Sequence, residues 1–167
     1  MGQKGFYFDQ TRCTGCRTCS VACSDLHNYA PDIVLRRVIE FEGGTWKVNT
    51  NGTCTQNVFA YYTSIGCGMC AKACPYGSPV LDKAAMKMRK CDGCVARTSK
   101  GGMPVCVEAC PERALEFGDI EELRKKHGNN AAIAPLPDPA ETKPCLTIRP
   151  CASAKPSGFK GGTAHRF

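Results

Sequence analysis

The strongest constraint on this chain is a run of four cysteines near its N-terminus. Cys13, Cys16 and Cys19 recur at every third residue, and Cys23 follows after a gap of three. A tight loop with this spacing can place three thiolates on three corners of a cubane iron–sulfur cluster, while the fourth cysteine points away toward a different cluster. The run therefore predicts one cluster site and requires a second cysteine motif elsewhere in the chain.

The second motif lies between residues 91 and 111. It opens with a Cys-x-x-Cys pair and closes with Cys-Val-Glu-Ala-Cys-Pro, after an insertion at 95–105. Because each fourth cysteine serves the other cluster, the ligands are expected to pair crosswise. The sequence thus predicts two [4Fe–4S] clusters, the first held by Cys13, Cys16, Cys19 and Cys110 and the second by Cys23, Cys91, Cys94 and Cys106.

Structural zinc is the main alternative for these cysteines, since Cys-x-x-Cys pairs also bind zinc. Zinc sites usually consist of two separated pairs, whereas the first motif has three cysteines at consecutive two-residue gaps. An extracellular disulfide scaffold would also explain 14 cysteines in 167 residues. No secretory signal precedes the first motif, so reduced thiolates and assembly in the cytoplasm are expected.

Charge and hydropathy exclude two classes of partner. The formal net charge of +7 suggests nucleic acid, but two clusters carrying roughly −2 each would reduce it to about +3. No stacking aromatic residues are interleaved with the basic ones, so no nucleic-acid binding is expected. No apolar run approaches the ~18 residues of a membrane helix, so no direct membrane span is expected.

The order of elements predicts an α+β fold, built as a ferredoxin-like pseudo-twofold repeat of strand, cysteine loop, helix and strand. Such a repeat would let each helix deliver its last cysteine to the opposite loop. Turn signals between the halves predict a small β insertion. The expected elements are a strand at 6–9, a helix at 18–27 and a strand at 33–41, then a strand at 85–89, a helix at 104–110 and a strand at 114–117.

Three segments follow from this pattern. A ferredoxin-like iron–sulfur domain is expected over residues 1–118 and a helix over 119–128, where Asp119 can cap the start and Gly128 the end. Residues 129–167 are rich in proline and predict an extended tail with little structure of its own. Its apolar residues favour an arm laid over a partner rather than a disordered end.

Several of these stretches together resemble the electron-transfer subunits of the dimethyl sulfoxide reductase family of molybdopterin oxidoreductases. The resemblance implies a subunit that carries electrons between a quinol-reacting membrane anchor and a molybdopterin-containing catalytic subunit. It would be held at the membrane through its partner, with export alongside the catalytic subunit as a variant of this arrangement. The resemblance is carried by residues 57–62, 90–94, 104–111, 114–118, 122–128 and 134–137.

The chain departs from that family in its middle, where residues 57–82 hold a degenerate cysteine block. The family pattern has four cysteine blocks and four clusters, but here Ser64 stands where one block should begin and the preceding block is absent. One interpretation is that Cys67, Cys70 and Cys74 are a reduced relic. The other is a third cluster in which Cys54 or Ser64 supplies the missing ligand.

No residue set indicates bond-making catalysis, because no nucleophile with a neighbouring base and no phosphate-binding loop is present. Clusters whose corners are all held by cysteine pass electrons and leave no open coordination position. An electron-transfer component of an oxidoreductase complex is therefore the first hypothesis. A free-standing two-cluster ferredoxin and a structural zinc module are the alternatives.

Overall fold

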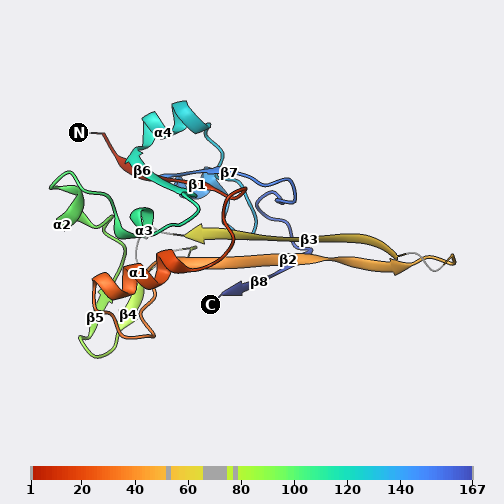
Figure 1. Ribbon diagram of the computed structural model, residues 1–167, viewed down its shortest axis with the longest axis horizontal. Coiled ribbons are helices and arrows are strands. Elements are labelled where there is room, and N and C mark those ends of the chain that lie inside the picture. Colours follow the sequence, from red (N-terminus) through yellow and green to blue (C-terminus); the bar gives the residue numbers. More distant parts are fainter. Residues whose placement is uncertain (1, 52–53, 66–74, 77–78, 167) are drawn as a thin grey trace.

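The computed structural model describes every residue except 1, 52–53, 66–74, 77–78 and 167, and it shows a mixed α+β protein (Figure 1). Three small sheets and short helices alternate along the chain. The elements are β1 (Lys4–Asp9), α1 (Thr18–Leu26), β2 (Arg37–Val48), β3 (Cys54–Ile65), β4 (Val80–Asp82), β5 (Lys87–Arg89), α2 (Val95–Thr98), α3 (Val105–Glu108), β6 (Leu115–Asp119), α4 (Ile120–His127), α5 (Pro139–Thr142), β7 (Leu146–Arg149) and β8 (Gly162–Arg166).

The main core forms around β1, which lies between two strands from the second half of the chain. β6 pairs with β1 antiparallel, and β7 pairs with its other edge in parallel. Helix α4 packs against all three strands (Figure 1). It begins where Asp119 accepts a hydrogen bond from the Glu121 amide at 3.0 Å and ends at Gly128, within the expected range. This sheet fixes the starting point of the first cysteine loop.

A long hairpin of β2 and β3 extends away from this core (Figure 1). Its strands pair antiparallel over their whole length, and β8 adds to the other edge of β2 near the base. The rings of Phe41, Phe59 and Tyr61 form a second, smaller cluster there. The expected small β insertion is therefore a twelve-residue ladder whose base joins the core through Ile39.

The strand pairing of a full twofold repeat is present in only one of its two halves. β1 pairs with β6, as the first and last strands of such a repeat would. β2, however, pairs with β3 and β8, and β5 pairs with β4. Among the described strands no ladder joins β2 to β5.

No helix of the described residues is both long enough and apolar enough to cross a bilayer.

Residues 129–167 differ from the expected extended tail. They supply β7 to the central sheet and β8 to the hairpin, and Ile133 and Leu136 lie in the main core. The Tyr61 hydroxyl donates a hydrogen bond of 2.8 Å to the carbonyl of Ala134. The physical reason is that β1 would otherwise present an unpaired edge beside apolar side chains. The tail thus forms part of the domain, whereas the sequence predicted an extended arm laid over a partner.

We expect Ile133→Ala to lower the free energy of unfolding by about 2–5 kcal/mol, since it opens a cavity in the core. Ile133 is 1% exposed. Unfolding of the anaerobically purified chain in denaturant, followed by circular dichroism, measures the change. The matched control is Met86→Ala at an 80% exposed site, for which we expect less than about 0.5 kcal/mol. Equal effects of the two substitutions would mean that the tail is not packed as described.

Candidate metal centres

The first cysteine loop is shaped by the turn that follows β1. The Asp9 carboxylate accepts hydrogen bonds from the amide and hydroxyl of Thr11, at 2.9 and 2.6 Å. Gly15 and Arg17 then take left-handed backbone conformations, with φ of 72° and 61°. A Cβ at Gly15 would clash with the Tyr62 ring, so only glycine fits there. The loop curls back on itself and enters α1, which carries Cys19 and Cys23 one turn apart.

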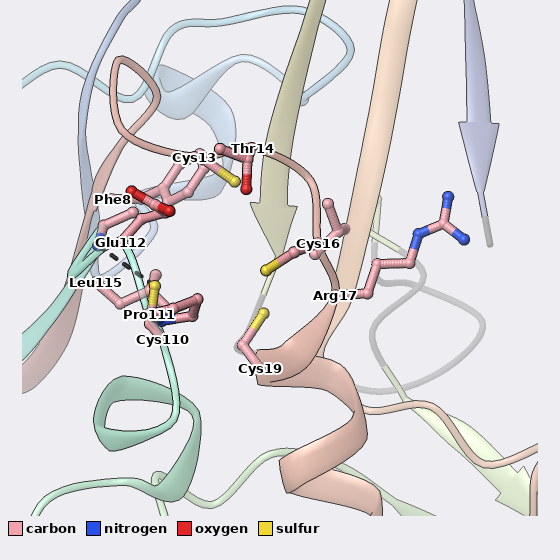
Figure 2. A pocket seen from close by; sticks show the side chains of 12 residues that line it. Phe8, Cys13, Thr14, Cys16, Arg17, Cys19, Cys110, Pro111, Glu112 and Leu115 are labelled. Carbon is pink, nitrogen blue, oxygen red and sulfur yellow. Dashed lines mark hydrogen bonds between the residues drawn. The ribbon is translucent and has the colours of Figure 1, made fainter.

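Four cysteines from both motifs surround one pocket. Figure 2 shows Cys13, Cys16 and Cys19 of the loop and Cys110, which follows α3, with their sulfur atoms directed into the same space. We call these four residues the first quartet. Apolar side chains, including Phe8, complete the wall. α1 and α3 pack against each other, which brings Cys110 to a loop that lies almost a hundred residues earlier.

The thiols of the first quartet influence one another electrostatically. Burial raises the pKa of Cys13, and the negative charges that Cys19, Cys110 and Cys16 would carry raise it further. Hydrogen bonds with the hydroxyl and amide of Thr18 lower the pKa of Cys16. Thiolates are the form that binds metal. Four thiolates this close therefore require a bound cation, which is the condition a cluster satisfies.

The second quartet consists of Cys23, Cys91, Cys94 and Cys106, three of which are buried. β5 leads to Cys91, and Cys94 adopts a left-handed conformation that begins α2. The Asp92 carboxylate accepts a hydrogen bond of 2.8 Å from the Cys94 amide and holds this turn. Cys106 comes from α3 and Cys23 from α1. Again one cysteine is contributed by the other motif.

The thiols of the second quartet influence one another's pKa values as those of the first do. Burial, followed by the charges of Cys91, Cys106 and Cys94, raises the pKa of Cys23 to about 12. Burial also raises the pKa of Cys106 to about 11, an effect that the positive charge of Arg36 opposes and that Cys91 and Cys94 reinforce. Ionising this buried quartet without a cation is therefore still less favourable than ionising the first.

Both quartets have a donor set that fits a [4Fe–4S] cluster, because each offers four thiolates and cluster iron is held by cysteine. The arrangement leaves no position for substrate when all four bind. The chain's own groups supply the wall: Phe8 and Leu115 line the first pocket, and Ile33 and Leu35 pack against Cys23. Such sites accept and release single electrons.

Sequence reasoning missed the position of His27. We expected this residue only to end a helix, and it does follow α1, but its Nε2 also lies 3.9 Å from the sulfur of Cys94. The ligand atoms of His27, Asp92 and Cys94 lie within 4.8 Å of one another. The spacing could have indicated this position, since His27 follows Cys23 by one helical turn. His27 is therefore a neighbour of the second quartet.

The middle cysteines Cys67, Cys70 and Cys74 lie outside the described residues. Their two interpretations, a reduced relic or a third cluster completed by Cys54 or Ser64, therefore stay predictions. Of the two candidate ligands, Cys54 begins β3 and Ser64 lies near its other end.

Comparisons with known proteins agree with the chemistry of these sites. Residues 47–120 match the family described as a 4Fe-4S dicluster domain. The chain is 44% identical to the probable anaerobic dimethyl sulfoxide reductase subunit YnfG of Escherichia coli and 43% identical to the B subunit of anaerobic dimethyl sulfoxide reductase from that organism. Each match covers 96% of this chain and 95% of the relative. The B subunit of polysulfide reductase from Wolinella succinogenes is 30% identical, over 87% of this chain and 93% of its own.

The alignments with the two Escherichia coli proteins are longer than this chain. The two Escherichia coli matches extend over 195 positions, whereas this chain has 167 residues. Those relatives therefore contain residues without a counterpart here. This agrees with the absence of one cysteine block that the sequence of the middle region indicates.

Proposed function

Because this chain belongs to the family of iron–sulfur subunits of anaerobic dimethyl sulfoxide reductases, we propose that it relays electrons through [4Fe–4S] clusters between a quinol-linked membrane anchor and a molybdopterin-containing catalytic subunit. The observation that carries this proposal is the convergence of eight cysteines into two quartets of four. Each quartet takes three members from one motif and the fourth from the other. A zinc module would not need this exchange.

The ligand assignment is part of the proposal. The first quartet would hold one cluster and the second quartet another, with the two cysteine loops acting as halves of a pseudo-twofold ferredoxin-like unit. The antiparallel pairing of β1 with β6 and the packing of α1 on α3 support this symmetry. Cys67, Cys70 and Cys74 would then remain as reduced thiols.

The two quartets are close enough for direct electron exchange. Cys19 and Cys23 belong to different quartets but lie one turn apart on α1, which separates their backbones by only about 6 Å. The charge of Cys19 also affects the pKa of Cys106. Helix α1 thus connects the two proposed sites through its own backbone, and no other residue has to carry the electron between them.

A free-standing two-cluster ferredoxin is the remaining alternative. The tail no longer distinguishes it from a subunit, because residues after Gly128 complete the domain's own sheets. Near-complete coverage of the dimethyl sulfoxide reductase subunits favours the subunit. We propose assembly in the cytoplasm and association with the membrane through the partner, and export with the catalytic subunit is the variant to test.

We expect the anaerobically purified chain to contain about eight iron atoms, as two cubane clusters require, and a brown absorbance that bleaches on reduction. Iron analysis and spin counting of the reduced protein measure this. Co-expression with the catalytic subunit should yield a complex containing molybdenum. About twelve iron atoms would indicate a third cluster, zinc without colour would contradict the proposal, and a stable lone holoprotein that never binds a partner would favour the ferredoxin.

A further inference from the structure

Arg36 is a buried cation that has no acidic partner among the residues that the structure describes. It is 3% exposed and precedes β2. Its Nε and Nη2 atoms are buried and have no hydrogen-bond acceptor in the part of the chain that the structure describes. None of the ion pairs among the described residues includes it. A buried charge is costly unless it is paired and hydrogen-bonded, so this guanidinium indicates an anion that completes the site.

The surroundings of Arg36 identify where that anion belongs. The preceding residue, Leu35, packs in the same buried cluster as Cys23. The guanidinium carbon lies 5.2 Å from the centroid of the Phe6 ring, and Phe6 belongs to the core cluster that contains both Cys106 and Cys110. The positive charge lowers the pKa of both cysteines against the effect of burial. Arg36 therefore lies beside the second quartet.

The backbone of Arg36 is held in place by the helix that carries Cys23. The Ser20 hydroxyl donates a hydrogen bond of 2.6 Å to the carbonyl of Arg36. Ser20 is on α1, between the two cysteines of that helix. The cation and one ligand of the second quartet are thus connected to the same rigid element, which is what a fixed electrostatic environment needs.

We propose that Arg36 is the counter-charge and sulfur-directed hydrogen-bond donor of the cluster held by the second quartet, and that it raises the reduction potential of this cluster above that of the first. The inference rests on the proposed function. A cubane with four thiolates carries a net negative charge, and its potential depends on that charge and on hydrogen bonds to sulfur. The unpartnered Nε and Nη2 atoms supply both.

Among the described residues that line its pocket, the first quartet has no cation directed at its sulfur atoms. Arg17 belongs to that pocket, but Figure 2 shows its guanidinium directed away from the four sulfur atoms. The two clusters would therefore differ in potential although their ligands are the same. An electron shared between the two clusters would reside mainly on the cluster beside Arg36, so electron transfer from the first cluster to the second would be favourable.

The experiment compares Arg36→Gln and Arg36→Lys in the full chain, purified anaerobically with its clusters. Arg37→Gln is the matched control, because it removes the same charge at the adjacent position. Potentials are measured by redox titration followed by electron paramagnetic resonance, together with iron content. The signal of the second cluster is the one that Cys91→Ser removes.

We expect Arg36→Gln to lower the equilibrium constant for reducing the second cluster at least about tenfold, or about 59 mV for one electron, with a smaller change at the first cluster. Arg36→Lys should recover most of this shift because it keeps the charge. Arg37→Gln should shift the second cluster less than Arg36→Gln does.

An unchanged second potential in Arg36→Gln would overturn the inference. If Arg36→Gln takes up no iron, Arg36→Lys decides. Two clusters with the second potential close to that of the wild-type chain would support the role of the charge, and loss of the second cluster, or a second potential lowered at least about tenfold in equilibrium constant, would overturn it. Wild-type chain without iron–sulfur signals would instead contradict the proposed function, and that result does not depend on Arg36.

Discussion

Replacing Cys23 by serine should remove the cluster of the second cysteine loop and spare the cluster of the first, although Cys23 follows Cys19 on the same helix. This result is expected if ligands are exchanged between the motifs, because the proposal assigns Cys23 to the quartet of Cys91, Cys94 and Cys106, whose charges raise its pKa. Iron content should fall from about eight to about four atoms per chain. The lost resonance signal should be the one that Cys91→Ser also removes.

The reciprocal substitution gives the matching expectation. Cys110→Ser should remove the signal that Cys13→Ser removes, because both residues line the first pocket. Cys145→Ser is the control, since Cys145 is outside both quartets and should leave about eight iron atoms bound. If Cys23→Ser removed the same signal as Cys13→Ser, each loop would hold its own four ligands and the crosswise arrangement would be refuted.

Quinol-driven turnover of a complex built with this chain should be at least about tenfold below turnover with a soluble reduced dye as the donor, a loss equivalent to about 1.4 kcal/mol of barrier. The reason is the missing cysteine block. The relatives contain residues that this chain lacks, and the clusters that such a block helps to hold would extend the path toward the anchor.

Restoring that block should restore quinol-driven turnover. The block would be inserted between Thr63 and Ser64, near the end of β3, and Ser64 changed to cysteine. The matched control is the same insertion with its cysteines replaced by serine, which should leave turnover low. Dye-driven turnover should be similar in all three complexes. Full quinol-linked turnover by the chain as it stands would show that two clusters are sufficient.

Local signals were sufficient for features that depend on spacing. The cysteine gaps grouped Cys13, Cys16 and Cys19 with Cys110, and these four line one pocket. Asp119 and Gly128 predicted α4, because capping acts over a few residues. Arg36 and His27 were not recognised. Whether an arginine is buried beside a thiolate depends on tertiary contacts, and one sequence position does not reveal them.

The tail shows the same limit at the level of the fold. Its prolines and short apolar stretches gave no periodic pattern, so nothing in residues 129–167 predicted a strand parallel to β1. β7 forms because the open edge of β1 lies next to it in space, although the two strands are over a hundred residues apart. Pairing at this separation depends on the rest of the fold being in place.

The central position of β1 affects how the protein is made. Both neighbours of this strand, β6 and β7, come from the second half of the chain. Cys106 and Cys110 likewise follow the first cysteine loop by more than eighty residues. Neither proposed quartet is therefore complete until most of the chain has been synthesised.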